Sequence, residues 1–294
     1  MAEECVLRLK GISDLIGALN KEAIHAMFAS SQVGKTTLWL EMLYDISDQL
    51  ERPVLYYDTE GGGEEFVKQW EPIYRKKYPK AQVDVRMKRD FRSILKDHGK
   101  LVTMKMSGGK AVSVAAKEKT SGKLSLTLVD ETFPSPMSKL VEEKNYAAIY
   151  YDSITMPMKF FGAEQQNFPV RNYAQTLWFG EMLNLIDEHA VYVIASHHSS
   201  KNPADPYAIE QMSGGSAVQY YSKIILYMKK WKANGATNYR SVKLVRYFNK
   251  PPNEHETLIK LTDQGYVDAT MADMEADKVE FAKAKAKKDA KYSK

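Results

Sequence analysis

The sequence predicts an α/β protein with a mainly parallel twisted sheet flanked by helices. Apolar runs of strand length alternate with segments of helical periodicity. A Gly-Lys-Thr tripeptide lies in the loop between the first such run and the helix that follows it. Two later runs end in acidic residues. Because ligands bind at the carboxyl ends of the strands in open α/β sheets, we expect the loop and the acids to share one site.

Each expected element follows from its local pattern. The strands are short apolar, β-branched or aromatic runs, and we place them at 23–28, 53–58, 146–153, 190–196, 223–228, 241–248 and 256–261. The last two of these strands are expected to be antiparallel. The helices repeat apolar residues three or four positions apart, and we place them at 37–44, 64–77, 172–188 and 216–222.

Residues 99–130 interrupt this alternation. Three stretches there alternate apolar and polar residues, with turns at Gly108-Gly109 and Ser121-Gly122. A Gly-Gly pair suits a tight hairpin. The pattern predicts a small β-meander inserted into a core of residues 1–270. Residues 271–294 are rich in Lys and Ala, which predicts either a solvated helix or a disordered tail.

Composition narrows the class of protein. The 294 residues are 44% hydrophobic and 27% charged, as in a soluble globular protein. No apolar stretch is long enough to span a membrane, and the first residues lack the apolar region of a signal peptide. The single cysteine, Cys5, excludes an internal disulfide and a thiolate metal cluster. We therefore expect a cytoplasmic protein, and its net charge of +5 mildly favours a polyanionic partner.

A phosphate-binding loop is the most specific pattern in the chain. In G-x-x-x-x-G-K-[ST], backbone N–H groups wrap the phosphates, Lys reaches the outer phosphates and the hydroxyl binds Mg²⁺. The expected helix after the loop would add its N-terminal dipole. The last three positions match, whereas alanine replaces the first glycine. The expected nucleotide-binding residues are Ala29, Ser30, Ser31, Gln32, Val33, Gly34, Lys35, Thr36 and Thr37. The alternative is an ordinary strand–turn–helix.

Two residues are candidates for holding Mg²⁺ beside this loop. Thr36 supplies the hydroxyl, and Asp152 follows an apolar strand, where P-loop enzymes place a magnesium carboxylate. An acid at a strand end can also cap a helix or lie in a solvated turn. The phosphate loop favours the metal role for Asp152.

Further residues at strand ends are candidates for catalysis. Lys35 would neutralise the outer phosphates, and Glu60 would orient or activate the attacking water, with Asp58 as its competitor. His198 could contact the γ-phosphate and transmit the nucleotide state to the loop after it. Zinc is the alternative for the His197-His198 pair, but neighbours on a strand face opposite ways and no third ligand at a convincing spacing accompanies them.

Taken in order, these residues resemble the RecA/RadA recombinase family of P-loop ATPases over most of residues 11–268, apart from the insertion. Residues 55–60 are similar to the strand that ends in the family's catalytic glutamate. Residues 149–155 are similar to its Walker B strand and the start of its first DNA-binding loop. Residues 193–198 resemble the strand that couples ATP to the second DNA loop. The later segments that resemble the family are 213–223, 242–246, 251–254 and 261–268.

The sequence also departs from the family pattern. Ala29 replaces a glycine, and His198 stands where the family has a glutamine. The chain starts almost directly with the core, without the helical N-terminal domain of RadA or its Phe-x-x-Ala linker motif. Phe281-Ala282-Lys283-Ala284 fits that motif, but in so Ala-rich a segment we interpret it as chance. These departures favour a RadA paralogue or a virus- or plasmid-encoded relative.

The resemblance implies a DNA-dependent ATPase of recombination and repair. ATP with Mg²⁺ would lie between protomers of a filament or ring, with Arg246 or Lys250 contacting the neighbour's phosphates. Single-stranded DNA, and also double-stranded DNA, would be the partner, with another recombinase as a further candidate partner and with no membrane. The expected DNA contacts are Lys159, Phe160, Phe161, Arg171, Lys201 and Tyr207. The alternatives are a hexameric helicase or packaging motor, and a non-motor mediator switched by ATP.

Overall fold

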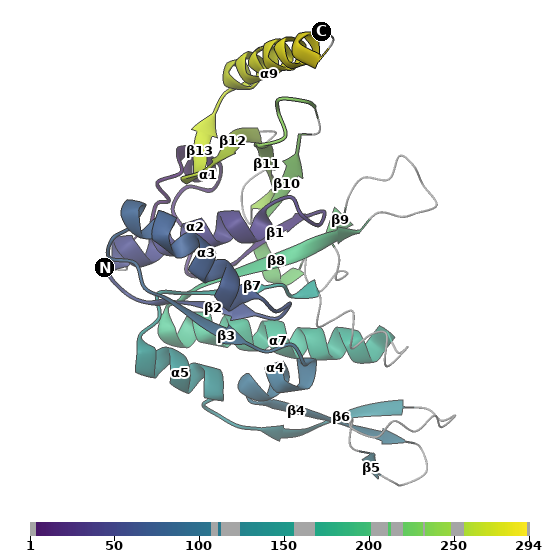
Figure 1. Cartoon of the computed structure of the whole chain (residues 1–294). Helices are drawn as coiled ribbons and strands as arrows, with labels where there is room; N and C mark the ends of the chain where they lie inside the picture. The colour runs from purple at the N-terminus through teal and green to yellow at the C-terminus, as the bar shows by residue number, and fades with distance from the viewer. Residues whose placement is uncertain are drawn as a thin grey trace.

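The protein is built around one large sheet between two layers of helices (Figure 1). In this computed structural model the described residues are 4–106, 111–112, 124–155, 168–200, 211–212, 220–231, 233–247 and 256–292. The strand order is β13-β12-β11-β10-β1-β8-β7-β2-β3, and β9 pairs with the end of β8. This arrangement confirms the α/β class with a mainly parallel sheet.

The six strands from β10 to β3 are parallel, and they form the middle and one side of the sheet. Most are nearly continuous apolar runs because helices cover both of their faces. Their bounds are β1 (Ile24–Ala29), β2 (Val54–Asp58), β3 (Val83–Met87), β7 (Ala148–Asp152), β8 (Tyr192–Ser200) and β10 (Ser222–Lys230). The strand register places Asp58 opposite Asp152 and Ala29 opposite His198. The expected site residues are thereby brought to one edge of the sheet.

Three antiparallel strands extend the other side of the sheet. They are β11 (Tyr239–Tyr247), β12 (Glu256–Thr262) and β13 (Gly265–Ala269). The sequence patterns predicted the first two. No apolar run predicted the third, which is five residues long and follows β12 through a two-residue turn, although it lies largely within the segment 261–268 that resembles the family.

Helices bury two apolar clusters against the sheet. One cluster contains Trp39 and Tyr44 of α2, and the other contains Trp178 and Phe179 of α7. In Figure 1, α2 and α3 lie over one face of the sheet, and α4, α5 and α7 over the other. The helix bounds are α1 (Lys10–Ile16), α2 (Lys35–Leu50), α3 (Gly63–Lys77), α4 (Phe91–Asp97), α5 (Pro136–Lys144) and α7 (Phe168–His189). None of the helices in the described ranges is both long and apolar enough to cross a bilayer.

The insertion forms a separate three-stranded antiparallel sheet, as expected, but its strand order is β5-β4-β6. Its strands are β4 (Lys100–Met106), β5 (Ala111–Val112) and β6 (Leu124–Glu131). In a meander the strands pair in sequence order, whereas here β4 is central. The reason is that β6 pairs along the whole of β4, and β5 adds only two residues to its other edge. The expected Gly-Gly and Ser-Gly turns lie outside the described residues.

The C-terminal segment is helical and forms α9 (Met271–Tyr292). It follows β13 at the edge of the large sheet and projects away from the body of the molecule in Figure 1. The expected helix at 216–222 lies mostly outside the described residues, and β10 begins at Ser222.

Candidate active site

The phosphate loop joins the end of β1 to the start of α2. Gln32 and Gly34 have positive φ angles of 60° and 107°, so the chain turns sharply there. A Cβ on Gly34 would lie 2.4 Å from Tyr266 Oη, so this position requires glycine for its conformation and for its space. Ala29, in contrast, is the buried last residue of β1, with extended backbone. Alanine fits there because a strand position does not require a positive φ angle.

Lys35 is folded over its own loop. Its Nζ donates hydrogen bonds to the carbonyl oxygens of Ala29 (3.2 Å) and Ser30 (3.3 Å). Burial lowers the pKa of Lys35, although the carboxylates of Asp152 and Glu60 act in the opposite direction. A buried cation that donates its hydrogen bonds to neutral carbonyl groups is positioned to gain from an incoming anion.

Thr36 and Asp152 form a close oxygen pair. Thr36 Oγ1 donates to Asp152 Oδ2 at 2.7 Å, and Tyr56 Oη donates to the same oxygen at 3.0 Å. Burial raises the pKa of Asp152, while these two hydrogen bonds lower it. Mg²⁺ prefers one or two protein oxygen ligands together with phosphate oxygens. A hydroxyl and a carboxylate beside a phosphate loop therefore fit this metal.

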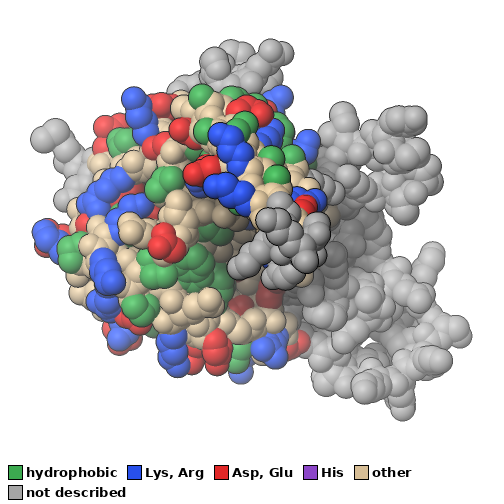
Figure 2. Space-filling model, turned by 45° about the horizontal axis from the view of Figure 1, so that its top comes forward, with side chains coloured by type: hydrophobic (Ala, Val, Ile, Leu, Met, Phe, Trp, Pro, Cys, Tyr) green, Lys and Arg blue, Asp and Glu red, His purple; other side chains and the backbone are tan. Residues whose placement is uncertain are grey.

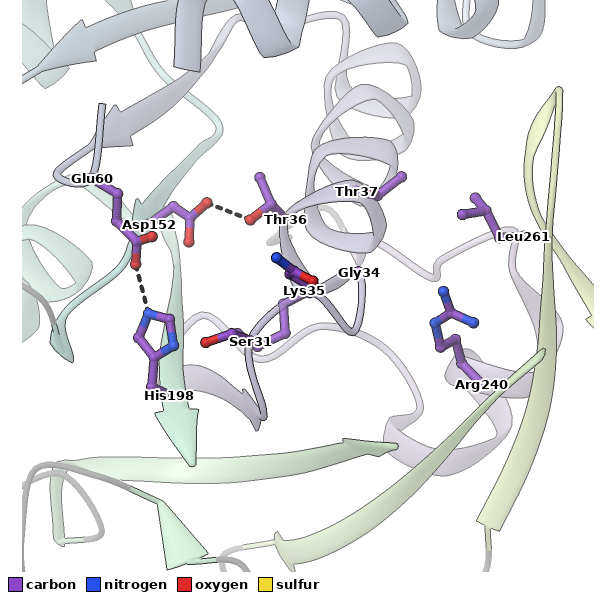
Figure 3. Close-up of a pocket in the computed structure, with 11 residues that line it drawn as sticks. Ser31, Gly34, Lys35, Thr36, Thr37, Glu60, Asp152, His198, Arg240 and Leu261 are labelled. Atoms are coloured by element: carbon purple, nitrogen blue, oxygen red, sulfur yellow. Dashed lines mark hydrogen bonds and ion pairs between the residues drawn. The ribbon is translucent and has the colours of Figure 1, made fainter. Parts of the chain in front are cut away.

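Glu60 and His198 are directly hydrogen-bonded across the pocket (Figure 3). His198 Nε2 lies 2.8 Å from Glu60 Oε1, and Ser153 Oγ donates to the same oxygen. Burial raises the pKa of Glu60. The hydrogen bonds from His198 and Ser153, with the charge of Lys35, outweigh it and lower the pKa overall. Glu60 is therefore a carboxylate at neutral pH.

Asp58 shapes the turn that carries Glu60. Its Oδ1 accepts the backbone N–H groups of Glu60 (2.9 Å) and Gly61 (2.7 Å), and its Oδ2 accepts that of Gly63 (2.8 Å). Both carboxylate oxygens are thus engaged with the backbone. Of the two acids, Glu60 is the one that lines the pocket.

The antiparallel strands form one wall of the pocket, which the sequence patterns did not indicate. Arg240, a residue that is 4% exposed, donates from Nε to the Val33 carbonyl and from Nη1 to the Thr237 carbonyl (2.7 Å). Tyr266 Oη donates to the Gly34 carbonyl at 3.3 Å. No local motif marks Arg240, since its role depends on a loop 207 residues earlier in the chain.

These groups surround one cavity of about 460 Å³. In Figure 3, Glu60, Asp152 and His198 lie on one side of the loop, and Arg240 and Leu261 lie on the other. The lining residues are Ser31, Gln32, Gly34, Lys35, Thr36, Thr37, Glu60, Asp152, His198, Arg240 and Leu261. Most of the expected nucleotide and catalytic residues therefore converge in one place.

Most of the other expected residues lie outside the part of the chain that the structure describes. Arg246 lies on β11 and is not among the described residues that line the cavity. Arg171 falls within α7, where only the backbone is described. The expected contacts Lys159, Phe160, Phe161, Lys201, Tyr207 and Lys250 lie outside the described residues. Within the described ranges no group of three His, Cys, Asp or Glu side chains could hold a metal ion.

Most of the chain is similar in fold to solved structures. The alignment with the crystal structure of the RadB recombinase covers 89% of this chain and 97% of that one, with a TM-score of 0.58 and 18% identity. The chain has the RecA-like fold. A KaiC-like protein from the hyperthermophilic archaeon Pyrococcus horikoshii aligns with a TM-score of 0.59 and 11% identity, covering 91% of this chain and 98% of that one. No protein-family model and no curated protein sequence matches the chain. The RecA-like resemblance of the sequence is thus confirmed at the level of the fold.

Proposed function

We propose that this RecA-like chain is an ATPase that binds ATP and Mg²⁺ in the pocket and couples the nucleotide to DNA binding in recombination or repair. The observation that carries the proposal is the convergence of Lys35, the Thr36–Asp152 pair and Glu60 on one loop of phosphate-binding type. Each group supplies a different part of phosphoryl-transfer chemistry.

Lys35 and the start of α2 would bind the phosphates. The Lys35 ammonium would exchange its two carbonyl partners for phosphate oxygens, which form stronger, charge-assisted hydrogen bonds. The N–H groups at the first turn of α2 point toward the same anion. Binding would therefore stabilise the loop in one conformation.

Thr36 and Asp152 would hold the metal ion. When bound, Mg²⁺ supplies the positive charge that neutralises the phosphate oxygens during transfer. Tyr56 keeps the Asp152 carboxylate in place through its hydroxyl.

Glu60 would position the attacking water and accept its proton. Its low pKa provides the carboxylate form that this role requires. In the structure the same carboxylate is hydrogen-bonded to His198 and Ser153. A phosphate contact with His198 would weaken that pairing and free Glu60 to act.

His198 would also connect the nucleotide to a DNA-binding segment. Ser199 and Ser200, directly after it in β8, pair with β9 (Gln211–Met212) in an antiparallel arrangement. Residues 201–210 connect these two strands in the sequence, and the RecA resemblance places a DNA loop there. Single-stranded DNA is the proposed partner. Filament or ring assembly, with Arg246 or Lys250 reaching a neighbouring nucleotide, is proposed on the resemblance alone.

A mediator with slow turnover is the second candidate. Its support is the hydrogen bond between Glu60 and His198, since a carboxylate oxygen that is engaged in this way is less available to water until the pairing is broken. In this function ATP binding rather than hydrolysis would control the protein.

The deciding experiment is ATP turnover with and without single-stranded DNA, for the wild-type protein, Lys35→Ala and the exposed control Lys76→Ala. DNA-stimulated turnover that is lost only in Lys35→Ala supports the proposal. ATP binding with no response to DNA favours the mediator. Equal turnover in wild type and Lys35→Ala contradicts the proposed site.

A further inference from the structure

The first part of α9 is fixed to the sheet. Met274 is fully buried beside Ala236 and Tyr239. Asp277 Oδ2 accepts hydrogen bonds from Tyr239 Oη (2.8 Å) and Lys260 Nζ (2.6 Å). A Cβ on Gly235 would lie only 2.8 Å from Lys278 Cα, so the turn before β11 packs closely against the helix.

The acidic side chains of α9 are concentrated in this anchored part. Asp273 caps the helix through the backbone N–H and hydroxyl of Thr270. Glu275 pairs with Lys278 at 2.6 Å, and Asp277 pairs with Lys260. These carboxylates are therefore occupied close to the sheet.

The next part of the helix carries a different charge pattern. Every residue from 282 to 289 is exposed, and we call this part the distal segment. It contains four lysines and one aspartate, which gives a formal charge of +3 in eight residues. The lysines are Lys283, Lys285, Lys287 and Lys288. Over much of the face drawn in Figure 2, in contrast, basic and acidic side chains are interspersed.

The arrangement of these lysines points to a polyanion as the partner. With 3.6 residues per turn, they spread over roughly 200° of the helix circumference. The other residues are three alanines and Asp289, so the segment has no broad face of large apolar side chains. A membrane-surface helix or a helix-packing partner requires such a face. The distal segment can therefore bind a partner mainly through its positive charge.

The phosphodiester backbone presents more than enough negative charge for every lysine of the distal segment. Eight helical residues span about 12 Å. Duplex DNA carries one negative charge per about 1.7 Å of its axis, or roughly seven charges over that length. Lysines bind phosphates as flexible point charges, without reading the base sequence.

We propose that the distal segment of α9 is a projecting arm that binds the phosphate backbone of nucleic acid, independently of sequence. It rests on the proposed function in taking nucleic acid as the partner. The arm lies outside the nucleotide pocket, so its contribution is separable from ATP chemistry.

The test is binding of fluorescent 30-nucleotide DNA, as single strand and duplex, across a series of salt concentrations. The variant replaces Lys283, Lys285, Lys287 and Lys288 with Gln, which has a similar helix propensity. We expect an affinity loss of about tenfold or more at low salt and a salt slope smaller by about 3 for single strands. Basal ATP turnover without DNA should be unchanged.

Two controls make the result specific. Replacement of the same four lysines with Arg should retain binding. Replacement of four exposed lysines on α3 and α5 with Gln matches the loss of net charge and should have a smaller effect; these are Lys68, Lys76, Lys139 and Lys144. Circular dichroism checks that the helix is retained. An RNA strand of the same sequence shows whether the arm prefers one backbone.

Several outcomes would contradict the proposal that the distal segment binds nucleic acid. Unchanged affinity and salt slope in the Gln variant would do so, as would an equal loss in the Arg variant or in the α3/α5 control. Lysine-dependent binding to phosphatidylserine vesicles in place of oligonucleotides would reassign the segment to membranes. If only the ATPase proposal is wrong, ATP turnover will be absent, while DNA binding will still depend on the four lysines.

Discussion

Tyr266 donates a hydrogen bond from its hydroxyl to the carbonyl of Gly34, a residue 232 positions earlier in the chain. The same tyrosine is also tied to α2, because its backbone N–H donates a hydrogen bond to Glu41 Oε2 at 2.6 Å. Lys77 also donates to Glu41, at 2.6 Å. The antiparallel end of the sheet thus holds the phosphate loop and its helix together.

Removing the Tyr266 hydroxyl should therefore weaken nucleotide binding. For Tyr266→Phe we expect ATP affinity to fall by about two- to tenfold, the effect of losing about 0.5–1.5 kcal/mol. Titration with a fluorescent ATP analogue measures this. Tyr239→Phe is the matched control, because it loses a bond to Asp277 on α9, outside the pocket. Equal affinities in both variants would show that Tyr266 does not support the loop.

Glu60→Gln should separate catalysis from binding. Loss of the general base lowers turnover by about 100-fold or more, while ATP affinity should stay within about threefold of wild type. Glu64→Gln, at an exposed site on α3, controls for the lost charge. Single-turnover hydrolysis and nucleotide titration give the two quantities. Turnover within a few-fold of wild type would remove Glu60 from the mechanism.

Asp58 should prove to be a positioning residue. Asp58→Ala leaves three backbone N–H groups without their acceptor, so we expect a loss of about 1–3 kcal/mol in the free energy of unfolding. Turnover should fall because the Glu60 turn loosens. Asp58→Asn retains one carbonyl acceptor and should recover part of both properties. If Asp58→Asn is fully stable yet inactive, Asp58 rather than Glu60 is the carboxylate that activates the water.

Two buried histidines should respond oppositely to replacement by leucine. Neither ring nitrogen of His197 has a hydrogen-bond partner among the described residues, whereas those of His98 lie 2.8 Å from the Ile94 carbonyl and 2.9 Å from Tyr151 Oη. His197→Leu should therefore leave the free energy of unfolding at pH 7 unchanged or higher, and His98→Leu should lower it. Denaturant unfolding measures both, and a large loss in His197→Leu would contradict this account.

The same histidines set a pH dependence of stability. Burial lowers the pKa of His197 to about 3 and that of His98 to about 4. An unfolded histidine titrates near 6.5, so between these values the unfolded chain binds the extra proton. Stability should fall as the pH drops below about 6.5, by about 1.4 kcal/mol per pH unit for each histidine. His197→Leu should make this slope shallower in unfolding curves from pH 7 to 4, and an unchanged slope would contradict the assignment.

The sequence could predict those parts of the site that lie in short continuous patterns. The phosphate loop and Asp152 each follow an apolar run, and the parallel register then brings them together. Arg240 and Tyr266 could not be predicted, because their contacts depend on how distant strands fold against the loop. The edge strand β3 was missed for a related reason. Val83–Met87 contains no apolar run, because none of its residues is fully buried in this edge strand.

The Thr36–Asp152 hydrogen bond has a consequence for the energetics of nucleotide binding. The threonine hydroxyl donates its one hydrogen bond to Asp152, so its lone pairs remain for a cation. Tyr56 restrains the carboxylate from a neighbouring strand. The conformational entropy of arranging these ligands is thus lost when the chain folds rather than when nucleotide arrives. Mutations that loosen Tyr56 would transfer that loss to the binding step, and nucleotide affinity would report it even with every ligand atom still present.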